Sequence, residues 1–517
     1  MAVSHRQIVG LILFVGVIII IVVVAAVLLA NSESNPGNTS TEQSAANLSY
    51  KTLLADYVFK PDDSYSFSIL DEYTQRDQNE AFTSYVLNVT SQTWLTEKAV
   101  DRSVWWHHLI ITVPDNRVFQ DLGVLFVSAG TNEDGLQDPL KDAENRVVSY
   151  IATQLGVVTA VLRQVPNQPI TFTGDHERRE RSESDLLAYT LRQFMEGTSD
   201  DCQLLLLFPM VKAVVRALDT LENFTDKTVN RYYISGSSER GWAAWLAASL
   251  DDRIVGVAPL VYGNINFIKN LKHHHRSLSG YSWAYSPYWT ENLTHFIDDP
   301  MGQYTLNILD PLSYSSQLDI PKFIILAGND EWHMPDSTRF FYDQMIGPTF
   351  LRIYPNTDNS LFGHWHHMAD DCIGFILTIE KGWQLPEVRW VSNENSSTGS
   401  IVISTNIKPT SVTTWSAVTP SDTRRRDFRL SRAKTENSTD TVPQTVLYQD
   451  VGVETLGPME FKAVVQKPQT KWVCFFIELI FPAPNNHRFS ITTEVSIVPD
   501  SYPIKECYGR ECVGTLV

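Results

Sequence analysis

The sequence predicts an α/β fold with a mostly parallel sheet, followed by a smaller β-rich domain. Between residues 122 and 354, short apolar runs alternate with stretches of helical periodicity, as in strands joined by helices that cover both faces of a parallel sheet. Beyond about residue 386 the helical periodicity ends, and short strand-like runs separated by turn-forming residues remain. A chain of 517 residues is long enough for two or three domains.

The N-terminal region is predicted to anchor the protein in a membrane. Residues 8–30 are uncharged and dominated by Ile, Val and Leu, which is enough to cross a bilayer at about 1.5 Å per residue. A cleavable signal peptide would have a shorter apolar run and small residues before the cleavage site. We therefore expect a single-pass type II protein with a cytosolic tail (1–7), a signal anchor (8–30) and a Ser/Asn-rich stalk (31–48). The bulk would be extracellular or lumenal, and the alternative is a protein secreted after cleavage.

Glycosylation and cysteine content agree with that side of the membrane. Five cysteines are too few for a disulfide-built fold, and Cys507 with Cys512 is the local candidate for a bridge. No metal spacing such as Cys-x-x-Cys occurs, and we expect neither a metal nor another cofactor. A net charge of −18 argues against a nucleic-acid partner. Asn-x-Ser/Thr sequons, predicted as glycosylation sites, fall at Asn38, Asn47, Asn88, Asn223, Asn292, Asn395 and Asn437.

The α/β domain is expected to span residues 49–385. Alternating residues at 64–69 and an aromatic run at 104–111 suggest antiparallel strands that lead into the sheet. An insertion rich in aromatics, Gly and Pro, at 266–311, is expected to cap the carboxyl edge of the sheet. Residues 386–500 are expected to form an immunoglobulin-like β-sandwich, followed by a tail at 501–517. The later strands are expected at 122–127, 157–162, 254–261, 322–327 and 350–354, and helices at 142–155, 184–196 and 210–224.

The strongest local motif lies between a strand that begins at Tyr232 and an Ala-rich helix. The connecting residues 236–241 read Gly-Ser-Ser-Glu-Arg-Gly. A strand that enters a helix through a tight Gly-x-Ser turn is typical of the nucleophile elbow of α/β-hydrolases, although the second glycine comes one residue later than in the common form. Ser238 would be the nucleophile, and the amide of Glu239 could face a developing oxyanion. The alternative is an ordinary strand–helix turn with a capping serine.

A serine hydrolase of this fold also needs an acid and further oxyanion donors. Asp330 follows the strand expected at 322–327 and is the candidate that would orient an imidazole. Asp336 is the alternative, but a residue after a proline at a helix start is better explained as a cap. The backbone near Gln164, in the loop after the strand at 157–162, is the candidate second oxyanion donor.

With these motifs in order, the chain resembles the PhoPQ-activated pathogenicity-related proteins, a family that includes an autocrine proliferation repressor of social amoebae. The resemblance covers about residues 52–482 and implies an α/β-hydrolase domain with a β-rich C-terminal domain. It also implies growth-repressing signalling for members like the amoebal one. Besides the elbow sequence at 234–246, the matching stretches are 164–169, 185–189, 209–213, 328–336, 354–356 and 426–429.

One departure from the family pattern concerns the catalytic base. After Pro-Asn the family typically has a histidine, whereas this chain has Asn359 there. Asparagine cannot take a proton from Ser238 near neutral pH. Substitutes at His364, His366 and His367 follow, and five residues of chain reach at most about 16–18 Å, so a rearranged loop could bring His364 to the serine. The run at 273–275 (His-His-His) is expected to be solvated in a loop.

Two functional classes follow from these residues. In the first, the protein is a growth-repressor-like signalling or binding protein with a weakened serine-hydrolase site, and its partner is a cell-surface receptor or a small carbonyl ligand. In the second, it is an active esterase- or peptidase-like hydrolase that uses Ser238, Asp330 and a displaced histidine. Asn359 favours the first class.

Overall fold

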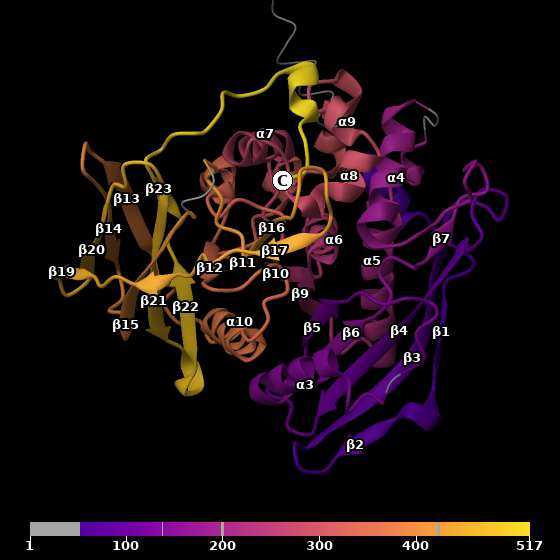
Figure 1. The fold of residues 1–517 in the computed structure, drawn as a ribbon. Coiled ribbons are helices and arrows are strands. Elements are labelled where there is room, and N and C mark those ends of the chain that lie inside the picture. The colour runs from indigo at the N-terminus through magenta and orange to yellow at the C-terminus, as the bar shows by residue number, and fades with distance from the viewer. Residues whose placement is uncertain (1–51, 137, 198–200, 421–423) are drawn as a thin grey trace, which may run out of the picture. The chain divides into compact units, whose positions relative to one another are not determined.

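The computed structural model describes residues 52–136, 138–197, 201–420 and 424–517 (Figure 1). Leu54–Val517 form one compact unit. The predicted cytosolic tail, signal anchor, stalk, Asn38 and Asn47 lie outside the described residues, and so stay predictions. Among the residues that are described, we find no helix with the length and apolar character needed to cross a membrane.

A ten-stranded sheet forms the centre of the α/β region, in the order β1-β3-β4-β6-β5-β9-β10-β11-β12 with β2 beside β3. The first strands pair antiparallel, and β6, β5, β9, β10, β11 and β12 run parallel to one another. The predicted α/β fold with a mostly parallel sheet is therefore confirmed. The strands are β1 (Ser66–Ile69), β2 (Gln75–Asp77), β3 (Phe82–Thr93), β4 (Val104–Pro114), β5 (Leu122–Val127), β6 (Val158–Leu162), β9 (Arg231–Ser237), β10 (Ile254–Leu260), β11 (Lys322–Ala327) and β12 (Thr349–Tyr354).

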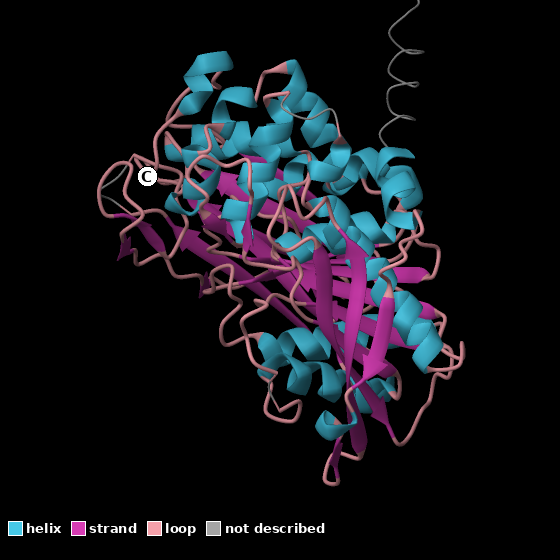
Figure 2. Ribbon diagram, turned by 90° about the vertical axis from the view of Figure 1, so that its right-hand side faces the viewer, coloured by secondary structure: helices cyan, strands magenta, loops and turns pink. Residues whose placement is uncertain are grey.

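Helices cover the two faces of this sheet (Figure 2). Helix α3 begins where the Asp142 side chain accepts the Asn145 N–H and ends at Gly156, whose φ of 67° suits glycine. α3 packs beside α10 on one face, and α5 packs beside α6 on the other. Residues 52–59 are helical, and the labelled helices that follow are α3 (Ala143–Leu155), α4 (Glu183–Met195), α5 (Leu207–Phe224), α6 (Glu239–Ala248), α7 (Phe267–Leu278), α8 (Ser286–Thr290), α9 (Pro300–Leu309) and α10 (Trp365–Glu380).

The segment predicted as an insertion contains α7, α8 and α9, between β10 and β11. The prediction that its three histidines are solvated in a loop is wrong, because they lie on α7 and are buried. His273 Nε2 lies 2.9 Å from Asp336 Oδ1, and His274 Nε2 accepts the Ser282 N–H at 3.0 Å. Polar partners from neighbouring segments thus compensate for the burial of His273 and of one nitrogen of His274, whereas Nδ1 of His275 is buried without a partner among the described residues.

The C-terminal region is β-rich, as predicted, and contains two antiparallel sheets, drawn in orange to yellow in Figure 1. Their inward residues, such as Ile401, Phe461 and Ile477, belong to one buried cluster. The immunoglobulin-like assignment and the boundary at residue 386 stay predictions. The sheets are β13-β14-β20-β19 and β18-β15-β21-β22 with β23 on β21, and the strands are β13 (Val388–Glu394), β14 (Thr398–Thr405), β15 (Ser411–Val418), β18 (Gln449–Asp450), β19 (Glu454–Gly457), β20 (Glu460–Gln466), β21 (Val473–Pro482), β22 (Arg488–Thr492) and β23 (Ser496–Val498).

The β-rich region packs directly on the α/β region. Gly374 of α10 lies so close to the backbone of Arg488 that no residue with a side chain would fit there. Phe489 of β22 packs edge-on against Phe323 and Phe350 of the central sheet, with ring centroids 5.3 and 5.1 Å apart. Shared packing thus joins the two regions in one buried core.

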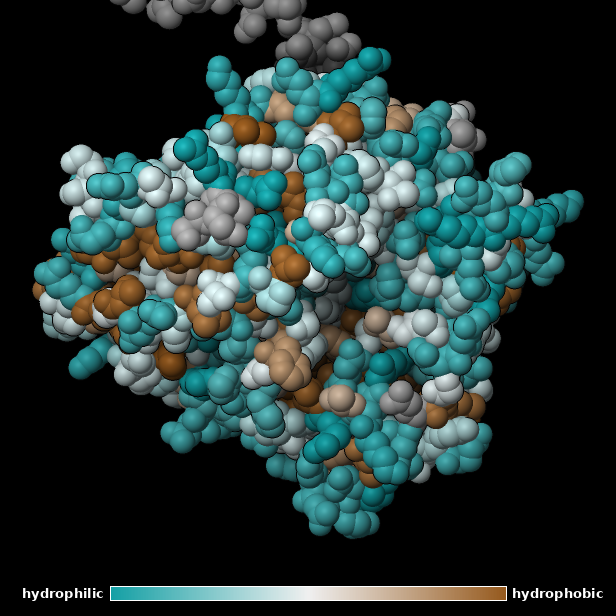
Figure 3. All heavy atoms as spheres, viewed as in Figure 1, coloured by the Kyte–Doolittle hydropathy of each residue, from teal (hydrophilic) through white to brown (hydrophobic). Residues whose placement is uncertain are grey.

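The β-rich region also exposes apolar side chains to solvent. They include Val391, Leu456 and Val464, and Figure 3 shows apolar surface around β19 and β20.

Four very short strands lie outside these sheets. In the segment between β6 and α4, β7 (Ile170–Thr171) pairs with β8 (Glu180–Arg181). In the β-rich region, β16 (Ser431–Ala433) pairs with β17 (Thr441–Pro443). Neither pair extends the ten-stranded sheet or the two sheets of the β-rich region described above.

Candidate active site

Ser238 stands at the junction of β9 and α6, with φ of 55° and ψ of −122°. A Cβ at Gly236 would lie 2.6 Å from the carbonyl oxygen of Arg240, and a Cβ at Gly241 would lie 2.9 Å from the Gly236 oxygen. Only glycine therefore fits at both ends of the hexapeptide. Ser238 has the strained backbone of a nucleophile elbow rather than that of an ordinary helix cap, and its side chain forms no capping bond.

Asp330 is held in a fixed position just beyond β11. The side chain is buried, and its Oδ1 accepts the backbone N–H groups of Trp332 at 2.7 Å and of His333 at 3.2 Å. Its Oδ2 accepts Nδ2 of Asn359 at 2.9 Å. The structure thus brings the predicted acid and Asn359 into direct contact.

Asn359 occupies the place of the expected imidazole without its chemistry. Its side-chain amide donates to Asp330 and, at 3.3 Å, to the backbone carbonyl of Val261. The amide nitrogen of asparagine has no lone pair available for a proton, so Nδ2 can donate hydrogen bonds but cannot act as a base. At this position nothing can take the proton of Ser238.

A different histidine, His333, lies beside the acid and was not considered from the sequence. Its Nδ1 is 3.1 Å from Asp330 Oδ2, its side chain is buried, and it lines the same cavity as Ser238. A neutral imidazole that donates from Nδ1 to a carboxylate keeps Nε2 as an acceptor. The signal that could have found it is its position three residues after Asp330, in the loop that the fold places at the carboxyl edge of the sheet.

The histidines predicted as substitutes lie around the start of α10 instead. The ring of His364 packs on Tyr354 with centroids 5.0 Å apart, and burial lowers the pKa of His364. The ring of His366 packs on Tyr150 at 5.4 Å. None of the three lines the cavity beside Ser238. The structure therefore does not bring His364 to the nucleophile.

The carboxylate of Glu239 lies close to the nucleophile. Its Oε1 accepts the Ser184 hydroxyl at 2.6 Å, and its Oε2 is 3.3 Å from a guanidinium nitrogen of Arg240. Burial by itself raises the pKa of Glu239, but Arg240, the Ser184 hydroxyl, its own backbone amide and the Ser238 hydroxyl together leave that pKa below its usual value. The ionised Glu239 carboxylate therefore accepts a hydrogen bond from its own backbone amide, which is the amide that was predicted to face an oxyanion.

The amide of Gln164 is not available to an oxyanion. It donates to the carbonyl of Ala129 at 3.1 Å, and the next amide, of Val165, donates to Ser128 at 3.2 Å. The Gln164 side chain accepts the backbone N–H of His108 at 2.8 Å. The loops after β5 and β6 thus hold each other, and Gln164 serves to join them.

Asp336 acts neither as the acid nor as a cap. It forms no capping bond, and its carboxylate lies 2.9 Å both from the guanidinium of Arg426 and from His273 Nε2. Burial raises the pKa of Asp336, but Arg426 and His273 outweigh burial and hold it far below its usual value. Asp336 therefore ties together α7, the loop after β11 and the segment that follows β15.

The other predicted sites have these positions. Cys507 and Cys512 form a disulfide. Each sequon asparagine within the described residues is exposed, as an acceptor of glycan must be, and glycosylation itself stays a prediction: these are Asn88, Asn223, Asn292, Asn395 and Asn437.

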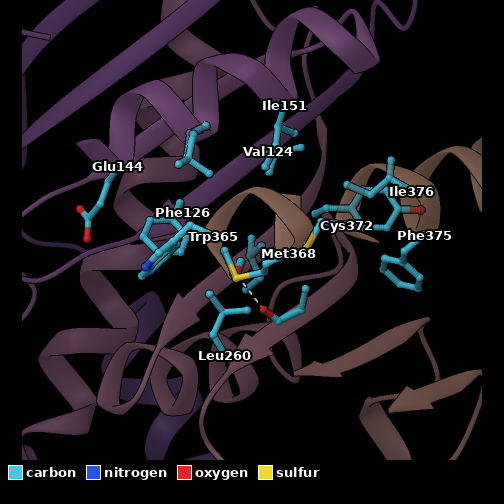
Figure 4. Close-up of a pocket in the computed structure, with 16 residues that line it drawn as sticks. Val124, Phe126, Glu144, Ile151, Leu260, Trp365, Met368, Cys372, Phe375 and Ile376 are labelled. Carbon is cyan, nitrogen blue, oxygen red and sulfur yellow. Dashed lines mark hydrogen bonds between the residues drawn. The ribbon is translucent and has the colours of Figure 1, made fainter. Parts of the chain in front are cut away.

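A larger apolar cavity lies under α3 and α10, away from this chemistry (Figure 4). Phe126, Leu260 and Met368 contribute to its lining, as does Glu144, which Figure 4 labels. Ser235, also in the lining, donates its hydroxyl to the Ala258 carbonyl at 2.6 Å. Neither Ser238 nor Asp330 is among the residues that line it. The candidate active site is therefore the smaller cavity that Ser238 lines.

Glu331 makes stability depend on pH. Its Oε2 accepts the Asn359 N–H at 3.1 Å, and burial together with the Asp330 carboxylate raises the pKa of Glu331 from 4.5 to about 7. A raised pKa contributes stability that is fully present below pH 4.5 and is lost as the pH rises through 7. We expect Glu331→Gln to raise the free energy of unfolding by about 2–3 kcal/mol at pH 8, since one pKa unit is about 1.4 kcal/mol. Near pH 4 the gain should vanish.

Urea unfolding of both proteins at pH 4, 6 and 8 measures this effect. Glu133→Gln, at an exposed carboxylate paired with Arg102 at 3.4 Å, is the matched control and should change little at any pH. A gain from Glu331→Gln that is the same at all three pH values would contradict the assignment.

The family model and the curated relative point to the same family, whereas the similarity to solved structures is lower. A family model described as PhoPQ-activated pathogenicity-related protein matches residues 54–429. Autocrine proliferation repressor protein A of Dictyostelium discoideum is 32% identical over 481 residues, which cover 90% of this chain and 94% of that protein. Acetyl xylan esterase 1 from a Thermoanaerobacterium species has a TM-score of 0.43 at 14% identity, over 63% of this chain and 92% of that one. An acetyl xylan esterase from a Paenibacillus species has a TM-score of 0.42 at 15% identity, over 65% and 94%.

Proposed function

Because the chain belongs to the PhoPQ-activated pathogenicity-related protein family, we propose that it is a growth-repressor-like signalling or binding protein with a weakened serine-hydrolase site. The observation that carries this proposal is the contact of 2.9 Å between Asn359 Nδ2 and Asp330 Oδ2. The acid orients an amide that cannot accept a proton. Loss of the base from a serine triad removes on the order of 10⁶ in turnover.

The surroundings of Ser238 support the same function. The ionised Glu239 carboxylate lies where a hydrolase needs donors, and a negative charge there opposes the oxyanion of an acyl-transfer intermediate. The strained elbow and an adjoining cavity are nevertheless retained. Such a site can hold a small ligand without turning it over rapidly.

The name of the Dictyostelium relative supports signalling as the outcome of that binding. With the predicted anchor at residues 8–30, the protein would present Leu54–Val517 on the extracellular or lumenal side, to a cell-surface receptor or to a small ligand. Secretion after cleavage would present the same unit.

An active serine hydrolase is the second candidate, and His333 is the observation that favours it. His333 lines the cavity of Ser238 and contacts Asp330, so a nucleophile and a base share one cavity and the acid lies behind the base. In that case His333, rather than His364, would be the displaced histidine.

Labelling with a fluorophosphonate probe separates the two candidates. For a weakened site we expect the purified full chain to be labelled no faster than its Ser238→Ala variant, because no base activates the hydroxyl. Fast labelling that is lost in both Ser238→Ala and His333→Gln would establish the hydrolase and overturn the first proposal.

The signalling role has its own readout. We expect wild type and Ser238→Ala, displayed by cells that express the full chain, to slow the proliferation of those cells equally. Repression by wild type that Ser238→Ala lacks would make the chemistry of the serine essential. Absence of repression in both would remove the growth-repressing role.

A further inference from the structure

Aromatic rings surround the cavity beside Ser238. The cavity is small and partly open to solvent. The Tyr285 ring lies 5.3 Å from that of Trp332 and 5.9 Å from that of Tyr288, and all three rings come from loops or helices after β10. The aromatic residues in its lining are Trp242, Tyr262, Phe267, Tyr285, Tyr288 and Trp332.

The charge that faces this cavity is negative. Glu239 is the acidic residue in the lining, its side chain is 13% exposed, and neither lysine nor arginine lines the cavity. Its cationic neighbour Arg240 also pairs with Glu183, so one guanidinium is shared between two carboxylates. The group of three therefore carries a net negative charge. His333 also lines the cavity, and it contacts a further carboxylate, Asp330.

A buried hydroxyl in the same lining has no partner. Tyr262 is 6% exposed, and among the described residues no group forms a hydrogen bond with its hydroxyl. The Tyr285 hydroxyl, by contrast, donates to the Trp332 carbonyl at 2.7 Å and accepts from Asn264 at 2.9 Å. A buried unpaired hydroxyl destabilises the protein, because it loses its hydrogen bonds to water without replacing them. A bound oxygen or nitrogen at this point would remove that penalty.

We propose that this cavity binds an organic ammonium cation that carries a hydroxyl or ester oxygen, with the cation between the aromatic rings and Glu239 and the oxygen at Tyr262. Rings of Trp and Tyr attract such cations through their electron-rich faces. A plain acyl chain would place hydrocarbon against the Glu239 charge. This inference rests on the proposed function, because it takes the cavity of Ser238 to be the ligand site.

Isothermal titration calorimetry of the purified full chain with choline tests the proposal. The uncharged carbon isostere of choline, dimethylbutanol, has nearly the same shape and provides the comparison. We expect choline to bind at least about tenfold more tightly than the isostere, since cation–π contacts and the carboxylate both require the charge. Equal affinity of the two compounds would overturn the proposal.

Two conservative variants locate the binding. Glu239→Gln should abolish the preference for choline over its isostere, whereas Glu133→Gln should keep it. Tyr262→Phe should weaken choline by about three- to tenfold but leave tetramethylammonium, which has no hydroxyl, unchanged. A Glu239→Gln protein that keeps the preference would place the cation elsewhere and overturn the proposal.

Failure of this proposal can be told apart from failure of the proposed function. Calorimetry does not depend on turnover, so fast labelling of Ser238 would overturn the weakened site and leave ammonium binding standing. Equal affinity for choline and dimethylbutanol would overturn ammonium binding and leave the weakened site standing.

Discussion

Asn359→His is expected to raise the rate at which a fluorophosphonate probe labels Ser238 by about 10²–10⁴-fold, the usual contribution of a general base. The position already contacts Asp330, whose carboxylate would hold the imidazole in the tautomer that accepts a proton. The strained elbow that presents the serine is in place. The measurement is the labelling rate of the purified full chain near neutral pH.

Two variants control this experiment. Asn359→Gln changes the size of the side chain without adding a base and should gain nothing. Asn359→His combined with Ser238→Ala should not be labelled. If Asn359→His folds as wild type does but gains less than tenfold, the missing base is not what limits Ser238, and the interpretation of Asn359 is wrong.

Arg426→Met is expected to lower the free energy of unfolding by about 3–5 kcal/mol, the usual loss when one partner of a buried ion pair is removed. Arg426 is fully buried, 2.9 Å from Asp336, and its guanidinium carbon lies 4.8 Å from the ring centroid of Tyr502. Without it, a buried carboxylate would lose its main cation. Denaturant unfolding measures the change.

The chain offers a matched control two residues earlier. Arg424→Met makes the same substitution at an exposed site and should change stability by less than about 0.5 kcal/mol. Adding Asp336→Asn to Arg426→Met should recover part of the loss, because the unpaired charge is then gone. Equal effects of the Arg424 and Arg426 substitutions would contradict a role for the pair.

This pair also explains the Arg-Asp-Phe-Arg sequence at 426–429. Arg426 reaches Asp336, in the loop that carries the candidate acid, and Arg429 pairs with Asp427 and donates to the backbone carbonyl of Val517. The segment after β15 therefore supports the site loop from the β-rich side. The match of residues 426–429 to the family is therefore explained by a structural role.

Much of the fold could be predicted, because strands and helices leave local signals. The apolar run that became β5 and the periodicity of α3 were located to within a residue or two. The predictions failed where contacts between residues far apart in sequence determine whether a side chain is buried. His273 is buried because Asp336 and Tyr502 contact it, and neither partner is visible from the histidine run itself.

The sequence by itself determined the Gly-x-Ser turn of Ser238 and the candidate acid Asp330, because each depends on a few adjacent residues at a strand end. The resemblance to the family added that Asn359 stands where a histidine is typical. Only the tertiary structure decided that His333 rather than His364 lines the cavity of Ser238, and that the Glu239 carboxylate accepts the Ser184 hydroxyl. It also decided that aromatic residues after β10 form the walls of the Ser238 cavity. The physical reason is that these contacts join segments separated by tens of residues, whose approach depends on packing across the carboxyl edge of the sheet.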